Sequence, residues 1–146
     1  MHLGKKIGYI SHMIKRSIDS LDNPYGVNGK QLRLLGFIAH ESMSRDLYQK
    51  DIEEELQIRR SSVTSMLQNL EKANMIRRIS VDKDARLKKI VLTDLGKEVT
   101  QNTYHKIISF EDELKSLFNE DEYNQFNDYL NKLEKYLKEK EENNND

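Results

Sequence analysis

The chain contains no cysteine, and this absence excludes several kinds of chemistry. Without thiols it has no disulfide, no thiolate metal ligand, no cysteine nucleophile and no thiol-based redox sensor. Proline occurs once and glycine six times, so helices can run long and sharp turns are few. No apolar run approaches the length of a membrane span, and the N-terminus lacks the apolar segment of a signal peptide. We therefore expect a soluble, cytoplasmic protein.

Charge is abundant and unevenly distributed. The 146 residues, 34% charged and 36% hydrophobic, suffice for one domain with a core or for a small domain with a dimerisation arm. Residues 59–89 hold nine cations against three anions, whereas residues 111–146 hold twelve carboxylates against five lysines. A basic patch on a near-neutral chain is typical of contact with phosphate. A charge run alone fits a solvated surface equally well.

Two helices are predicted before the basic region. Apolar side chains recur at steps of three and four over residues 3–21, which predicts an amphipathic helix. Turn residues at 22–26 end it. Asn28, followed three positions later by Gln31, has the spacing of a capping box and predicts a second helix running to about residue 41.

The basic region predicts two short helices and a hairpin. Residues 48–56 and about 60–72 have helical periodicity, with a turn at 57–58 between them. Residues 76–81 and 88–92 alternate β-branched and charged side chains, which predicts two strands joined by a turn at 82–85. A polar helix followed by a cationic hairpin can fill one major groove of DNA and reach the next minor groove. A winged helix-turn-helix is therefore the leading hypothesis.

The C-terminal part predicts long helices. Thr93 caps a helix through about residue 118, and Asn119 with Glu122 has capping-box spacing for a last helix. A tail at 141–146 is expected to be disordered. The terminal helices hold more apolar surface than a small winged domain can bury, which predicts a homodimer built from helices of both ends.

At this point the sequence resembles the multiple-antibiotic-resistance-regulator (MarR) family of bacterial transcription factors, over about residues 7–137. The sharpest match is residues 84–96, DARLKKIVLTDLG, which fit the wing signature D-x-R-x-x-x-[apolar]-x-L-T-x-x-G. A second match runs from SSVT at 61–64 through LEK at 70–72 to IRR at 76–78. The resemblance implies a mainly α fold, with a winged helix-turn-helix domain at 28–93 and a dimerisation region at 1–27 and 94–140.

The resemblance places the helix at 60–72 in the major groove. Small hydroxyl side chains would let it approach bases and backbone closely. Gln68 and Asn69 can each form two hydrogen bonds to an adenine edge, worth about 1–3 kcal/mol of discrimination. Ser61 and Ser62 have helix capping as an alternative role.

The hairpin tip would reach the minor groove. Arg86 lies near the tip, where a guanidinium feels the negative potential of that groove. Asp84 can form a fork with Arg86 and orient it. The alternative is a surface ion pair worth about 0–1 kcal/mol.

One pair of residues departs from the family pattern. Arg59 and Arg60 stand where many relatives have a capping Asp and a Pro. Cations at a helix N-terminus oppose the helix dipole, so this pair fits best with phosphates nearby. The residues expected to contact DNA are Arg59, Arg60, Ser61, Ser62, Thr64, Ser65, Gln68, Asn69, Lys72, Arg77, Arg78, Lys83, Asp84, Arg86 and Lys88.

A pocket for an aromatic or anionic effector is a further implication of the resemblance. It would lie where the first, second and fifth helices meet the DNA-binding lobe, with aromatic and Met side chains as walls and Arg16 or a histidine as the orienting group. For each residue taken singly, a filled dimer core is the stronger interpretation. The pocket candidates are Tyr9, His12, Met13, Arg16, Phe37, His40 and Tyr104.

Neither an enzyme nor a metal site is expected. The histidines at positions 2, 12, 40 and 105 have no neighbouring ligands at metal-binding spacing, and no phosphate loop or nucleophile elbow is present. No cofactor is expected. The leading hypothesis is a homodimeric repressor that binds a pseudo-palindromic operator and releases it when a small ligand binds. The alternative is a non-catalytic protein that uses the winged fold to bind another protein, or to organise DNA without sequence preference.

Overall fold

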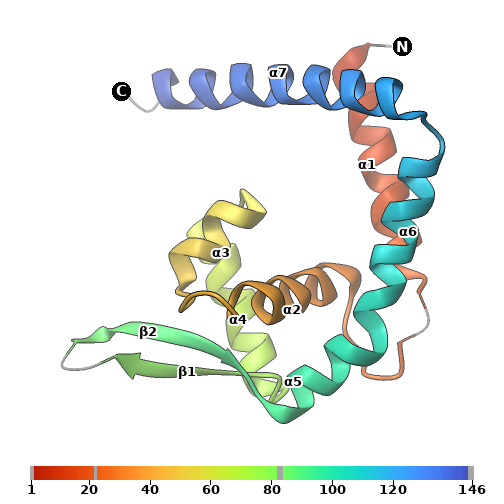
Figure 1. Cartoon of the computed structure of the whole chain (residues 1–146). Coiled ribbons are helices and arrows are strands. Elements are labelled where there is room, and N and C mark those ends of the chain that lie inside the picture. The colour runs from red at the N-terminus through yellow and green to blue at the C-terminus, as the bar shows by residue number, and fades with distance from the viewer. Residues whose placement is uncertain (1, 22, 82–83, 145–146) are drawn as a thin grey trace. The chain divides into compact units, whose positions relative to one another are not determined.

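A computed structural model describes residues 2–21, 23–81 and 84–144, with the backbone alone at residues 84 and 85. The elements are α1 (Leu3–Asp19), α2 (Gly29–Glu41), α3 (Gln49–Leu56), α4 (Arg60–Lys72), β1 (Ile76–Val81), β2 (Asp84–Leu92), α5 (Asp94–Val99), the π-helical turn η1 (Thr100–Tyr104), α6 (His105–Ser116) and α7 (Glu120–Asn144). Helices and one two-stranded antiparallel sheet make up the described fold, so the mainly α winged helix-turn-helix prediction is confirmed (Figure 1).

The chain forms two compact units, residues 1–108 and residues 109–146. The predicted division, with a DNA-binding domain at 28–93 and a dimerisation region at 1–27 and 94–140, stays a prediction. The first unit holds the helix-turn-helix and the hairpin, but also α1, α5 and η1, because α2 contacts each of these three elements. We call residues 1–108 the winged unit and residues 109–146 the C-terminal unit, and we describe each by itself.

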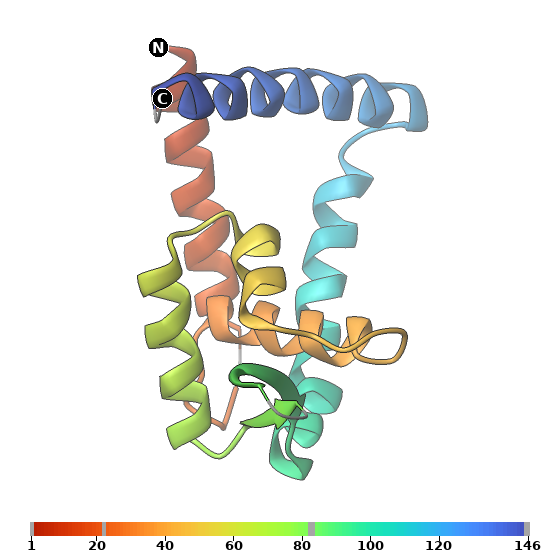
Figure 2. The same ribbon diagram turned by 90° about the vertical axis from the view of Figure 1, so that its left-hand side faces the viewer.

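The core of the winged unit is built around α2, which crosses the middle of the unit (Figure 2). Because α1, β2, α5 and η1 all contact α2, its apolar side chains are enclosed on several sides rather than along one stripe. The predicted capping box starts this helix: Asn28 Oδ1 accepts from the Gln31 amide at 2.9 Å, and Gln31 Oε1 accepts from the Asn28 amide at 3.0 Å. The fully buried core residues include Leu32, Leu34, Leu35, Ile38, Leu47, Ile52, Val63, Leu67, Leu70, Ile76, Ile90 and Ile107.

The helix predicted to run unbroken from Thr93 is interrupted by η1. Thr93 begins α5 as predicted, and its hydroxyl accepts from the Gly96 amide at 3.0 Å. At η1 the ring of Tyr104 lies against α2 at Gly36, where an added Cβ would fall 2.1 Å from the ring. The widened turn thus occurs where an aromatic ring reaches a backbone without a side chain. Local periodicity could not reveal this contact, because its two partners are far apart in sequence.

The hairpin is longer than predicted. β2 begins at Asp84, so part of the turn expected at 82–85 is strand, and residues 82 and 83 lie outside the described residues. The register places Ile76 opposite Leu92 and Arg78 opposite Ile90. The amide of Ile90 also donates to the carbonyl of Leu47 at 2.8 Å, which joins β2 to the segment just before α3.

The C-terminal unit consists of the end of α6 and the 25-residue α7. Asn119 and Glu122 form the predicted capping box, with hydrogen bonds of 3.0 and 2.9 Å. The rings of Phe118 and Phe126 stack with centroids 5.4 Å apart, and Lys115 lies over the ring of Tyr123 at 4.8 Å. α7 has no buried residue.

α7 also extends further than expected. It continues to Asn144, so the disorder expected from Glu141 is not found over residues 141–144. Good helix formers explain the extension, because Glu and Lys dominate this stretch and Lys138 pairs with Glu134 one turn earlier at 2.6 Å. Residues 145 and 146 lie outside the described residues. Among the described helices, none combines the length and apolar character needed to cross a bilayer.

Candidate nucleic-acid interface

α3 and α4 form the helix-turn-helix. Gln57 ends α3 in the left-handed region, with φ of 50°, and this turn directs the chain into α4. Ile52 on α3 and Val63 on α4 are fully buried. Gln49 Nε2 donates to Thr64 Oγ1 at 2.8 Å, and the Thr64 hydroxyl donates to the Arg60 carbonyl at 2.9 Å. Thr64, predicted to contact DNA, therefore fixes α3 to α4 with its side chain.

The outward face of α4 carries the other predicted recognition residues. Ser61, Ser65, Gln68 and Lys72 follow one another at helical spacing, so they share one stripe, and all are exposed. Ser62 and Asn69 flank this stripe and are also exposed. Within the described residues none of these six side chains has a hydrogen-bond partner, so their polar groups are available to a ligand.

The N-terminus of α4 has no side-chain cap. Arg59 occupies the N-cap position, and neither Ser61 nor Ser62 fulfils the alternative role of capping. Arg59 and Arg60 are both exposed beside the amide groups of the first turn. Open amides and two guanidinium groups at a helix N-terminus favour an anion such as phosphate.

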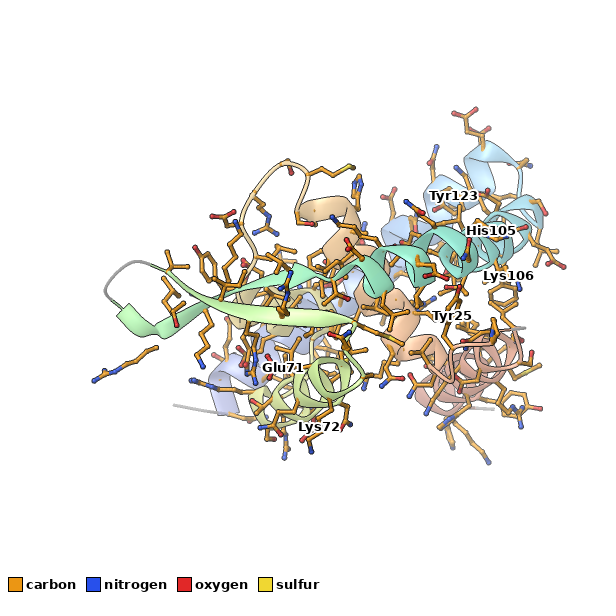
Figure 3. All side chains as sticks on the ribbon, turned by 90° about the horizontal axis from the view of Figure 1, so that it is seen from below. Tyr25, Glu71, Lys72, His105, Lys106 and Tyr123 are labelled. Atoms are coloured by element: carbon orange, nitrogen blue, oxygen red, sulfur yellow. The ribbon has the colours of Figure 1, made fainter. Side chains whose placement is uncertain are left out.

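The cations of the hairpin fall into two groups. Arg77 and Lys88 are exposed, whereas Arg78 pairs with a carboxylate of α4 and Lys89 with one in the segment before α3. Arg78 Nε and Nη2 donate to Glu71 Oε2 and Oε1 at 3.2 and 3.0 Å, and Glu71 lies at the end of α4 beside the strand (Figure 3). Lys89 Nζ lies 2.9 Å from an Asp46 oxygen.

The two ion pairs shift the pKa values of Glu71, Arg78 and Lys89. The hydrogen bonds from Arg78 lower the pKa of Glu71, and Glu71 in turn raises the pKa of Arg78. Asp46 raises the pKa of Lys89 in the same way. These shifts favour the charged forms of Glu71, Arg78 and Lys89 at neutral pH.

The hairpin tip is described only in part. Arg86 is exposed. Lys83 and the side chain of Asp84 lie outside the described residues, so the predicted fork between Asp84 and Arg86 stays a prediction.

The predicted effector residues all lie in the winged unit, but they line no common described cavity. Tyr9, His12, Met13 and Arg16 are exposed on α1, and His40 is exposed at the end of α2. Phe37 and Tyr104 are half-buried. A hollow of about 510 Å³ lies elsewhere, between the end of α2, β2, α5 and η1, and none of the seven residues lines it. Within the described ranges no three His, Asp or Glu side chains gather as metal ligands would.

Three residues of the interface were missed from the sequence: Glu71, Asp46 and Gln49. Glu71 and Gln49 hold the predicted residues Arg78 and Thr64 in place, and Asp46 pairs with Lys89. Each of the three comes from a different element or loop. The available signal was weak. Glu71, which directly precedes Lys72, is the one carboxylate in the sequence of α4.

Comparison with known proteins agrees with this geometry. The sequence model described as MarR family matches residues 25–87. The HTH-type transcriptional regulator PecS of Dickeya dadantii (strain 3937) is 27% identical over 128 residues, which are 88% of this chain and 77% of PecS. The HTH-type transcriptional regulator PapX of Escherichia coli is 31% identical over 103 residues, 66% of this chain and 62% of PapX.

The fold is similar to that of a regulator solved on DNA. The S. aureus MepR–DNA complex matches with a TM-score of 0.87 and 27% identity, over 94% of this chain and 99% of the MepR chain. The sequence matches, the winged helix-turn-helix and the exposed polar face of α4 point to one conclusion. Over residues 25–87 the chain matches the MarR family, and its winged helix-turn-helix fold is similar to that of the transcriptional regulators named above.

Proposed function

We propose that this chain is a MarR-family regulator that acts as a homodimer, binds a pseudo-palindromic operator and represses transcription until a small ligand lowers its affinity for DNA. The proposal that the protein recognises DNA sequence rests on the polar stripe on the outward face of α4. Its polar side chains are exposed and without partners among the described residues, on a helix held by a buried core. Such a stripe can exchange hydrogen bonds with base edges at little cost in reorganisation.

Apolar side chains exposed in both units support the homodimer. Large apolar patches on a soluble protein mark association surfaces, because their exposure to water is unfavourable. A second copy of the chain would cover them and would set two α4 helices about one turn of DNA, roughly 34–36 Å, apart. The exposed residues are Leu3, Ile7, Ile10 and Met13 on α1, and Leu117, Phe118, Phe126, Leu130 and Leu137 in the C-terminal unit.

The effector part of the proposal rests on accessible aromatic and cationic groups. Tyr9 and Met13 are exposed on the same helix as Arg16, so an aromatic acid could meet both an apolar surface and a guanidinium. A ligand shifts the protein away from its DNA-binding state only if it binds the other state more tightly. A regulator of this kind acts in the cytoplasm, where bacterial DNA lies.

Selection of bound duplexes from a random pool tests the proposal most directly. We expect a palindromic consensus with half-sites about one turn apart. Sedimentation of the free protein at micromolar concentration should give the mass of a dimer. A pool that shows no enrichment would favour the alternative, a protein that organises DNA without sequence preference or binds another protein.

A matched pair of variants separates base contacts from phosphate contacts. Gln68→Ala should relax the selected consensus at one position of each half-site, costing about 1–3 kcal/mol there. Lys88→Ala should leave the consensus unchanged and reduce the salt dependence of binding by about one unit of slope. Equal losses on every duplex for both variants would contradict base recognition by Gln68.

A further inference from the structure

The pair formed by Glu71 and Arg78 joins the recognition helix to the wing. Glu71 lies on the last turn of α4, and Arg78 is the third residue of β1. Two nitrogens of one guanidinium meet two oxygens of one carboxylate, at 3.0 and 3.2 Å. A bidentate fork of this kind fixes the orientation of both groups as well as their separation. It is therefore suited to set an angle between two elements.

The strand register explains why Arg78, rather than Arg77, makes this contact. Side chains alternate between the two faces of a strand, so Arg78 lies on the same face as Ile76, which is fully buried. Arg77 points to the opposite face and is exposed. Neighbouring arginines of identical charge thus occupy different environments, and only one of them is directed at α4.

The second strand is joined to the segment that precedes α3, the other helix of the motif. The backbone of Ile90 donates to Leu47, and Lys89 pairs with Asp46, so β2 is tied to the segment that leads into α3. A two-stranded hairpin is only marginally stable by itself. These contacts hold each strand of the wing against one side of the helix-turn-helix.

We propose that Glu71 and Arg78 are positioning residues for sequence-specific DNA binding: they hold the wing at the angle at which α4 and the wing meet one duplex together. This inference rests on the proposed function. Arg78 then contributes its guanidinium to the protein rather than to a phosphate. Without the fork the wing samples more orientations. The wing then has to be ordered during binding, and this cost weakens the complex in which α4 and the wing both contact DNA.

The competing role for Arg78 is that of a phosphate contact, as the sequence predicted. The two roles give opposite signs for a change at Glu71. If Arg78 binds phosphate, Glu71 competes with DNA for the guanidinium, and Glu71→Gln should strengthen binding to every duplex. If the pair positions the wing, Glu71→Gln should weaken specific binding although it removes a negative charge from the interface.

The experiment measures fluorescence anisotropy of full-length protein with the selected duplex and with a random duplex, at several salt concentrations. For Glu71→Gln we expect roughly three- to tenfold weaker binding to the selected duplex and no loss on the random one, in the usual range for coupled neighbours. Arg78→Lys keeps the charge but not the fork, so it should lose specificity to a similar degree with an unchanged salt slope.

Arg77→Gln is the matched control, because it removes the same charge from the adjacent residue on the opposite face. It should weaken binding to both duplexes by a similar factor. It should also make the dependence of affinity on salt concentration shallower by about 0.9 units of slope. In double-mutant cycles, Glu71→Gln and Arg78→Gln should be strongly non-additive, whereas Glu71→Gln and Arg77→Gln should be additive. Thermal melts establish that each variant is folded at the assay temperature; a small effect is expected for a pair that is partly exposed.

Tighter binding of Glu71→Gln to both duplexes, or an additive cycle for Glu71 and Arg78, would overturn this inference alone. An Arg78→Lys protein that discriminates between the two duplexes as well as the wild type does would also overturn this inference alone. Wild-type protein that discriminates no sequence would overturn the proposed function, and this inference with it. The outcomes are distinguishable because the first three require a wild-type protein that discriminates sequences and the last does not.

Discussion

The winged unit and the C-terminal unit differ in how their helices are held. In the winged unit, side chains from α2, α3, α4, both strands and α6 are fully buried against one another. In the C-terminal unit, α7 runs for 25 residues without one buried side chain. The winged unit is also the basic part of the chain and the C-terminal unit the acidic part. The difference is that the first unit has a buried core of its own, whereas the apolar side chains of α7 lie exposed, where the proposed homodimer would cover them.

The largest test of this comparison is to remove residues 119–146. We expect the shortened chain to keep the helices of the winged unit but to be monomeric and to lose operator binding, because the apolar side chains of α7 no longer contribute to a dimer. Sedimentation, far-UV circular dichroism and a shift assay measure the three consequences. A truncated chain that is still dimeric and binds its operator would show that α7 is not needed for the proposed dimer.

The same substitution in each unit sharpens the comparison. Leu67 is 0% exposed in α4, whereas Leu130 is 39% exposed in α7. Leu67→Ala should lower the free energy of unfolding by about 2–5 kcal/mol at any protein concentration, because it leaves a cavity. Leu130→Ala should act through the dimer.

The measurement is thermal melting over a wide range of protein concentration. The Tm of Leu67→Ala should fall by a constant amount. The decrease in Tm caused by Leu130→Ala should depend on protein concentration, because association stabilises the folded state by mass action. A constant deficit for both variants would show that Leu130 belongs to an intrachain core.

A pair of glycines tests how tightly the winged unit is packed. An added Cβ at Gly96 would lie 2.1 Å from the carbonyl oxygen of Met75, and backbone cannot easily move away. Gly96→Ala should therefore lower the free energy of unfolding by about 1–3 kcal/mol. Gly8 on α1 has nothing within 4 Å, so Gly8→Ala should raise helix stability by about 0.5–1 kcal/mol. Denaturant melts that give the same sign for both variants would refute this account.

The smallest expected effects have opposite signs in the two units. Gln57 has a left-handed backbone conformation, so Gln57→Gly relieves backbone strain. The change also loses the hydrogen bond from the side-chain amide of Gln57 to the Glu54 carbonyl. We expect a net gain of about 0.5 kcal/mol. Gln125, in the interior of α7, should lose about 0.5–1 kcal/mol when changed to glycine. Urea midpoints measure both, and a loss at Gln57 would mean that its hydrogen bond outweighs the strain.

Much of the fold was predictable because its signals are local. The capping boxes at Asn28 and Asn119 involve residues three positions apart, and both were found as predicted. α4 begins at Arg60 and ends at Lys72, as its periodicity indicated. Alternation along Ile76–Val81 was enough to predict β1. In each case the structure is decided by neighbours within one turn or one strand.

The features that were not predictable depend on contacts between distant segments. η1 depends on the approach of Tyr104 to Gly36, which periodicity near residue 100 does not encode. Arg78 was predicted to contact DNA because of its charge alone, whereas in the structure it pairs with Glu71. Charge is visible in a sequence, but which cation finds a carboxylate depends on strand register and on where the neighbouring helix ends.

The backbone bond between Ile90 and Leu47 makes one amide proton a natural reporter of wing motion. That proton can exchange with deuterium only when β2 separates from the segment before α3 or when the unit unfolds. Its exchange rate, relative to that of deeply buried amides in α2, therefore measures how often the hairpin lifts away without global unfolding. Duplex or effector that locks or loosens the hairpin would change this rate selectively, without any label attached to the protein.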